Sequence, residues 1–293
     1  MASSRSQIEA VLCCPDGIVR DRLWMWGHPA GSHNTAKDKT QWPHTDYGIP
    51  NSSRMTPAEG ALYMGIPNVV MVRYMGRPEP NSIAENAIPL SPFKRVVWSI
   101  NLRVHRSRAP EFGWTPSDEA EHSVVRGLLK QYPNFTGIML DDYFKSEGPM
   151  TRISKREDLI AFKAGFGHRD FWDGLYTSEI EQTNRDYLDL MDVVALWTRN
   201  DDDLPHLDQN LAKLESIHPR ARTVLGCYMW DYLGDKKPLP VALMRHQCEL
   251  GLKWLKNGRI EGLVFLSNNV CDMELETVEW ARRWIQQVGD ERI

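Results

Sequence analysis

Short runs of apolar and β-branched residues recur along the whole chain and alternate with segments whose apolar residues follow helical spacing. Eight runs have the length and composition of buried strands. They cover residues 23–26, 68–74, 93–101, 136–140, 171–177, 192–197, 223–230 and 262–267. Strands that are apolar on both faces are typical of a parallel sheet covered by helices.

Helical spacing and helix-end signals occupy the stretches between these runs. Thr56, Pro57 and Glu59 form a capping box with proline at the first helical position, which predicts a helix start. A short helix is expected at 83–87 and a longer one after Ser117, where acidic residues in the first turn suit the helix dipole. Further helices are predicted at 154–166, 180–191, 207–217, 240–257 and 275–285.

Eight strands alternating with helices predict one fold above others. Alternation indicates a parallel sheet, and eight units in a chain of 293 residues match an α/β fold consisting of a single (β/α)₈ TIM barrel. We expect one domain, 1–293, with a leader at 1–21, the barrel at 22–288 and a long polar loop after strand one. A doubly wound open sheet is the alternative, but neither a G-x-G-x-x-G nor a Walker sequence is present, and no cofactor is expected.

The composition of the chain limits the classes of partner that we expect the protein to bind. Hydrophobic residues make up 42% and charged residues 25% of the chain, which is typical of a globular protein. A net charge of -4, without a basic stripe, argues against nucleic acid. The five cysteines are an odd number without metal spacing and predict reduced thiols in a cytoplasmic protein. No apolar run is long enough for a signal peptide or a membrane span, so we expect a soluble protein; a signal removed before this numbering would leave no trace.

Polar side chains follow nearly every predicted strand. Since the carboxyl ends of barrel strands meet at one mouth, these side chains are expected to converge there. Carboxylates, aromatic rings, arginine and asparagine around one cavity suit a carbohydrate or glycoside, and 11 tryptophans are many for this length. The predicted catalytic residues are Asp141, Asp142, Asp201 and Glu179. The predicted substrate-binding residues are His28, Arg73, Asn101, Trp197, Arg199, Tyr228, Trp230, Asp231, Asn268 and Asn269.

Glycosidic cleavage requires one acid that protonates the leaving oxygen and one carboxylate that acts as nucleophile or base. Strand alternation places Met139 and Asp141 on one face of the fourth strand and Leu140 and Asp142 on the other, so only one carboxylate points straight into the barrel. We favour Asp141. Glu179, after strand five, is the reserve acid or base.

Two segments resemble known enzymes. The sequence G-I-M-L-D at 137–141 resembles the fourth-strand segment of TIM-barrel glycoside hydrolases of the α-galactosidase and α-amylase clans, and W-T-R-N-D at 197–201 is similar to the sixth-strand segment of the α-galactosidase clan. The resemblance implies that Asp141 is the nucleophile, that Asp201 is the acid/base and that Arg199 holds a sugar hydroxyl and the acid. Met139 stands where these clans have Lys or Arg, and the run 201–203 leaves the identity of the acid open. The chitinase motif D-x-x-D-x-D-x-E is absent, since Tyr143 stands at its Glu position.

Three other functions are compatible with parts of the sequence. A metal-dependent TIM-barrel hydrolase or isomerase would use His28, His33 and His44 with Asp142 or Glu179, but their spacing matches no metal signature, and no metal is expected. A Ser or Cys nucleophile lacks the G-x-S-x-G sequence. A non-catalytic carbohydrate-binding barrel would keep the aromatic rings and use the acids only as hydroxyl acceptors.

Overall fold

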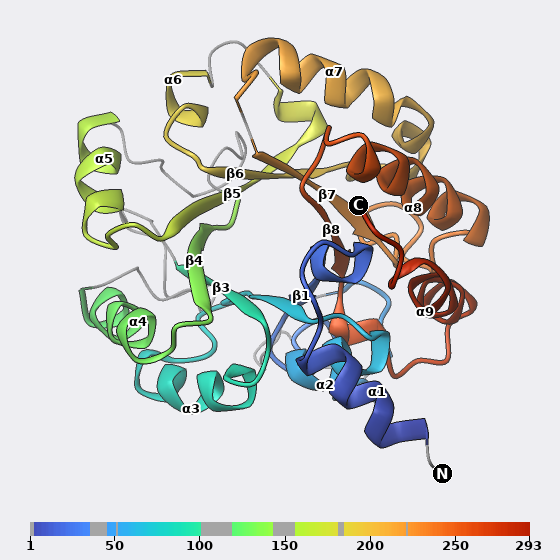
Figure 1. The fold of residues 1–293 in the computed structure, drawn as a ribbon, viewed down its shortest axis with the longest axis horizontal. Coiled ribbons are helices and arrows are strands. Elements are labelled where there is room, and N and C mark those ends of the chain that lie inside the picture. Colours follow the sequence, from blue (N-terminus) through green and yellow to red (C-terminus); the bar gives the residue numbers. More distant parts are fainter. Residues whose placement is uncertain are drawn as a thin grey trace.

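The computed structural model of the protein describes residues 3–35, 46–50, 52–100, 119–142, 156–180, 185–220 and 222–293. Eight parallel strands close into a barrel in which each strand pairs with the next along the chain and the eighth pairs with the first. Figure 1 shows the strands at the centre and the helices arranged around them. The predicted (β/α)₈ TIM barrel is therefore confirmed.

The strands are short and, in the main, buried along their whole length. Leu23 of the first strand lies opposite Leu263 of the last, which closes the ring. The strands are β1 (Leu23–Gly27), β2 (Asn68–Met71), β3 (Arg95–Ile100), β4 (Phe135–Leu140), β5 (Asp170–Tyr176), β6 (Val193–Trp197), β7 (Arg222–Tyr228) and β8 (Gly262–Leu266).

Helices cover the outside of the barrel, and α1 lies within the predicted leader. They are α1 (Ser3–Leu12), α2 (Pro57–Met64), α3 (Ile83–Ala87), α4 (Glu119–Gln131), α5 (Arg156–Ala164), α6 (Arg185–Leu188), α7 (Leu207–Ile217), α8 (Val241–Lys256) and α9 (Glu276–Val288). The expected capping box is present at α2: the Thr56 side chain accepts from the Glu59 backbone, and the Glu59 carboxylate accepts from Thr56. None of the described helices is long and apolar enough to cross a bilayer.

Tryptophan rings fill the barrel interior. Trp24 of β1 packs edge-on against Trp172 of β5 with ring centroids 4.9 Å apart, and Trp26 packs in the same way against Trp197 of β6 at 5.0 Å. These strands are not neighbours, so the rings meet across the barrel. Gly226 of β7 makes room for them, because a Cβ atom there would overlap the ring of Trp197. The core thus ends in aromatic side chains that form the floor of the mouth.

Several predicted elements end earlier than expected, and three of these differences bear on the loops at the mouth of the barrel. Strand two was predicted to reach residue 74 but ends at Met71, since the chain turns at 74–77, where Tyr74 and Arg77 bond to each other. Strand seven ends at Tyr228 rather than 230. The helix predicted at 180–191 is α6, Arg185–Leu188, and residues 181–184 lie outside the described part of the chain. All three differences fall at the carboxyl ends of strands or in the segment that follows one, where loops depart from the barrel.

Candidate functional site

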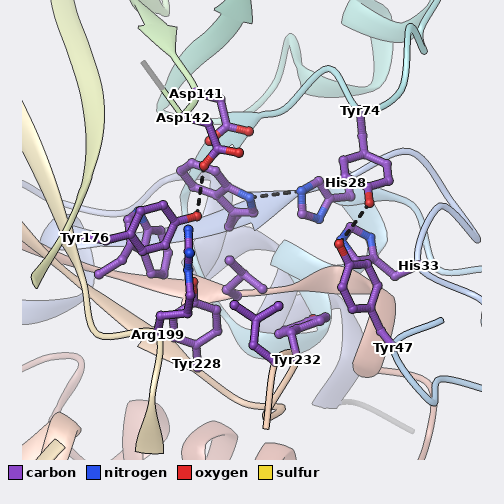
Figure 2. Close-up of a pocket in the computed structure, with 14 residues that line it drawn as sticks. His28, His33, Tyr47, Tyr74, Asp141, Asp142, Tyr176, Arg199, Tyr228 and Tyr232 are labelled. Atoms are coloured by element: carbon purple, nitrogen blue, oxygen red, sulfur yellow. Dashed lines mark hydrogen bonds between the residues drawn. The ribbon is translucent and has the colours of Figure 1, made fainter. Parts of the chain in front are cut away.

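An aromatic pocket of about 180 Å³ opens at the carboxyl ends of the strands. A space of this size accommodates several water molecules or one small polar ring. Figure 2 shows the side chains that surround it. The lining residues are Trp26, His28, His33, Tyr47, Tyr74, Asp141, Asp142, Tyr176, Trp197, Arg199, Tyr228, Tyr232, Leu233 and Leu266.

Two adjacent carboxylates, Asp141 and Asp142, form one wall of the pocket (Figure 2). Strand alternation predicted that only Asp141 would face inward, and this prediction was wrong. The strand ends at Leu140, and Asp142 has a φ of 57°, in the left-handed region that Asp tolerates better than most residues. The backbone turn redirects its side chain, so both carboxylates reach the same cavity.

Tyr176, at the end of β5, connects the carboxylates to a cation. Its hydroxyl donates a hydrogen bond to Oδ1 of Asp142 at 3.0 Å, and the guanidinium of Arg199 lies 3.8 Å from the centre of its ring. Burial raises the pKa of Tyr176 well above its usual value, and burial also raises the pKa of Tyr228. Both hydroxyls therefore remain protonated and able to donate.

His28, just after β1, is a neutral imidazole at the pocket wall. Its Nε2 atom accepts a hydrogen bond from Nε1 of Trp26 at 3.1 Å, so the ring hydrogen is on Nδ1. Burial and the neighbouring His33 lower the pKa of His28 well below its usual value. The Nδ1 atom is buried, and none of the residues that the structure describes forms a hydrogen bond with it. An oxygen acceptor on a ligand in the pocket would satisfy it.

His33 is neutral with the opposite tautomer. Nδ2 of Asn269 lies 2.7 Å from its Nδ1 and 2.9 Å from Oγ of Ser32, which makes Nδ1 an acceptor and places the ring hydrogen on Nε2. Burial lowers the pKa of His33 to about 3. The ring stacks on Tyr74 at 4.5 Å and on Tyr47 at 5.1 Å. The two histidines thus present N–H groups beside aromatic faces.

Several predicted binding residues stand behind the pocket and hold its wall. Asn268 accepts from the backbone N–H of His28 at 2.7 Å and donates to its carbonyl at 3.0 Å, while Asn269 orients His33. Nε1 of Trp230 donates to the carbonyl of Tyr47 at 2.9 Å. None of Asn268, Asn269 and Trp230 lines the cavity. We assign them to positioning the residues that do.

Asp231 and Arg73 have structural partners of their own. The Asp231 carboxylate accepts from the backbone N–H groups of Gly234 and Asp235, which shapes the turn after β7. Arg73 forms an ion pair with Glu121 of α4 in which both side chains are fully buried. Neither lines the pocket. Asn101, another predicted binding residue, lies outside the described part of the chain.

The two remaining predicted acids also stand outside the pocket lining. Glu179 is in the 3-10 helix Thr177–Glu179 and accepts from the backbone N–H of Tyr176 at 3.4 Å. Asp201 begins the 3-10 helix Asp201–His206. Of the four predicted acids, Asp141 and Asp142 thus line the pocket, and Asp201 and Glu179 do not.

Sequence reasoning missed much of the aromatic lining. Tyr74 ends the predicted strand 68–74, and Tyr176 stands one residue before the end of the predicted strand 171–177, so the strand-end rule that found Tyr228 could have found both. Tyr47 comes from the connection after strand one, and no sequence signal places it beside Tyr74. The hydroxyls of Tyr47 and Tyr74 lie 3.2 Å apart on one side of the pocket (Figure 2). Within the described ranges, no three His, Cys, Asp or Glu side chains gather where they could hold a metal ion.

No family model matches this chain, and no curated protein matches it in sequence. Solved structures do resemble it. A catalytic-site mutant of active domain 2 of chitinase from Pyrococcus furiosus gives a TM-score of 0.54 at 11% identity, covering 92% of this chain and 96% of that one. A protein classed as an α-L-fucosidase from Bacteroides thetaiotaomicron gives 0.52 at 10% identity, covering 94% and 99%. The expected resemblance to TIM-barrel glycoside hydrolases is thus confirmed at the level of the fold.

Proposed function

We propose that this protein hydrolyses a glycosidic bond with the pair Asp141 and Asp142. One observation carries the proposal: both carboxylates line the same aromatic pocket at the carboxyl ends of the barrel strands. TIM-barrel enzymes carry their active sites at this end of the barrel. Chitinase and fucosidase domains have the same barrel fold, and this analogy of fold agrees with the proposed reaction class without establishing it.

Cleavage by this route needs one carboxyl group that carries a proton and one that is ionised, and we assign the proton to Asp142. Asp142 gives that proton to the glycosidic oxygen while the bond from this oxygen to the anomeric carbon breaks, and the leaving group departs as an alcohol. The Asp141 carboxylate either bonds to the anomeric carbon, to be displaced later by water, or takes a proton from the attacking water. Both routes consume one water and leave the pair with one proton.

The rest of the pocket suits an uncharged sugar ring. The indole of Trp197 and the phenol ring of Tyr228 offer apolar faces, with centroids 5.2 Å apart. The Nδ1–H of His28 and the guanidinium of Arg199 can donate to hydroxyl oxygens. Each donor is held by an aromatic neighbour, since Trp26 fixes the ring of His28 and Tyr176 lies under Arg199.

A second candidate function is carbohydrate binding without turnover. It is favoured by the positions of Asp201 and Glu179 outside the pocket lining, which leave the two catalytic roles to residues adjacent in the sequence. A binding protein would use Asp141 and Asp142 only to accept hydrogen bonds from sugar hydroxyls.

Chromogenic aryl glycosides of hexoses, 6-deoxyhexoses and 2-acetamidohexoses, together with calorimetric binding of the free sugars, separate the two functions. For an enzyme, we expect Asp141→Asn and Asp142→Asn each to lower kcat by about 10²- to 10⁴-fold while sugar binding remains. Asp202→Asn is the control, because Asp202 is exposed and lines neither the pocket nor a cavity beside it. If the unmodified protein binds a sugar but does not hydrolyse its glycoside, and both Asn variants lose this binding, the protein is a carbohydrate-binding protein and the proposed hydrolase is wrong.

A further inference from the structure

A second cavity of about 330 Å³ adjoins the aromatic pocket. It lies among the segments that follow β5, β6 and β7. Arg199 and Leu233 line both spaces, so the two cavities share part of their wall. A molecule that extends from the pocket past Leu233 is directed toward the second cavity.

Leu233 offers an apolar surface at this boundary. Its side chain is 55% exposed, and single exposed leucines are common on proteins, so exposure alone decides nothing. Its position is held, however, because both carboxylate oxygens of Asp231 accept from the backbone N–H groups just beyond it, at 2.8 Å from Gly234 and 2.5 Å from Asp235. A side chain at Gly234 would collide with this carboxylate. The turn therefore keeps Leu233 between the two cavities.

Polar groups surround the rest of the second cavity. Ser178 stands on the β5 side, and Asn200 and Asp203 stand on the β6 side. The side chain of Asn200 accepts from the backbone N–H of Asp202 at 3.1 Å, which ties it to the start of the 3-10 helix. Among the described lining residues, Arg199 is the one cation, and the Asp203 carboxylate opposes an anionic ligand. An apolar surface ringed by hydroxyl, amide and carboxylate groups suits an uncharged sugar.

We infer that the second cavity is a binding subsite for a neighbouring sugar unit, so that the substrate is a neutral glycan of at least two units. One unit occupies the aromatic pocket, and the next lies over Leu233 with its hydroxyls toward Asp203 and Ser178. This inference rests on the proposed function, since it assigns a ligand to the space beside the same pocket. The observation that carries the inference is the wall shared by the two cavities at Arg199 and Leu233.

The test compares an aryl monosaccharide with the corresponding aryl disaccharide, chosen from the sugars that the protein hydrolyses. We expect Leu233→Ser and Asp203→Ala each to lower the ratio of kcat/KM for the disaccharide to kcat/KM for the monosaccharide by about tenfold, since each removes a contact made only or mainly by the second unit. Asp202→Ala is the matched control: it changes the same helix, is exposed, and should leave the ratio as it is. Circular dichroism verifies that each variant is folded.

The outcomes separate this inference from the proposed function. Suppose that Asp141→Asn and Asp142→Asn abolish hydrolysis but that the disaccharide-to-monosaccharide ratio of kcat/KM is unchanged in both Leu233→Ser and Asp203→Ala. The proposed subsite is then wrong, and the proposed hydrolase activity is retained. If the protein binds but does not hydrolyse sugars, the hydrolase is wrong. The subsite is then tested by calorimetry, where a disaccharide must bind more tightly than a monosaccharide and lose that advantage in Leu233→Ser.

Discussion

The phenolic hydroxyl of Tyr176 donates a hydrogen bond to Oδ1 of Asp142 across the ends of the neighbouring strands β4 and β5, at 3.0 Å (Figure 2). Asp142 sits on a left-handed backbone turn, and this contact holds its side chain in the pocket beside Asp141. The same ring lies against Arg199. One residue thus aligns a carboxylate and a cation at the proposed reaction centre.

Removing this hydroxyl is the first prediction. Tyr176→Phe keeps the ring and its contact with Arg199 but releases the Asp142 carboxylate. A hydrogen bond to the neutral acid contributes about 0.5–1.5 kcal/mol, so we expect kcat to fall by about 2- to 10-fold with little change in KM. Steady-state kinetics measure both constants. Tyr132→Phe, just before the other end of β4, is the control. An unchanged kcat in Tyr176→Phe would show that the Tyr176 hydroxyl does not align Asp142 for catalysis.

The close approach of Gly226 to Trp197 gives a second prediction. In Gly226→Ala the new methyl group overlaps the indole ring, which must move out of the pocket wall. We expect a loss of about 1–3 kcal/mol of stability from overpacking and a raised KM for the sugar. Urea denaturation and kinetics report the two effects. In contrast, Gly127→Ala on α4 meets no atom within 4 Å and should stabilise the protein by up to about 1 kcal/mol.

The buried histidines predict a loss of stability in acid. The pKa of His33 is about 3 in the folded protein and near 6.5 when the chain unfolds. Between these values the unfolded state binds a proton that the folded state does not, so the free energy of unfolding falls as the pH falls. The slope from His33 is about 1.4 kcal/mol per pH unit, or about 2 kcal/mol lost by pH 5. His28, whose pKa is also lowered, acts in the same direction.

Urea denaturation between pH 8 and pH 4 measures this loss. The variant His33→Gln retains an acceptor for Asn269 but cannot take up a proton, so its stability should depend less steeply on pH below 6. His206→Gln changes an exposed histidine and should leave the curve unaltered. An identical slope in His33→Gln and the unmodified protein would show that His33 titrates normally in the folded state.

The buried ion pair between Arg73 and Glu121 gives a prediction about stability rather than binding. Both side chains are inaccessible to solvent, so Glu121→Gln removes one charge of a buried ion pair in a region of low dielectric. Removing one partner of a buried pair costs about 3–5 kcal/mol. Chemical denaturation should show this cost, whereas Glu85→Gln, at an exposed position on α3, should be nearly neutral. A direct role for Arg73 in the site would instead reduce sugar affinity at full stability.

Sequence patterns located the strand ends but not the directions of the side chains there. Asp141, Asp142, Trp197, Arg199, Tyr228 and His28 were expected at the mouth, and all of them line the pocket. Asn268 and Asp231 follow strands equally closely, yet they bond to backbone groups behind the wall. The strand-end rule predicts where the backbone of a residue lies, but it does not predict the rotamer of the side chain. A change in χ1 alone decides whether the side chain faces the pocket or the backbone groups behind its wall.

The resemblance to glycoside hydrolases implied Asp141 and Asp201 as the two acids, and of these only Asp141 lines the pocket. The pattern around Trp197 placed the second acid at Asp201, whereas the pocket contains Asp142. Strand alternation had directed Asp142 away from the interior. Alternation holds only while the backbone is extended, and Asp142 is the second residue past the end of β4.

The order of strands, the closed barrel and the end of the barrel that carries the site were determined by the sequence itself, because they depend on local periodicity and on chain connectivity. The composition of the pocket was decided by the tertiary structure. The ring of His33 stacks on Tyr47 of the same connection and on Tyr74 of the next one. The tautomer of His33 is set by Asn269, 236 positions away. Such contacts depend on where distant backbone segments come to rest, and no local pattern encodes that position.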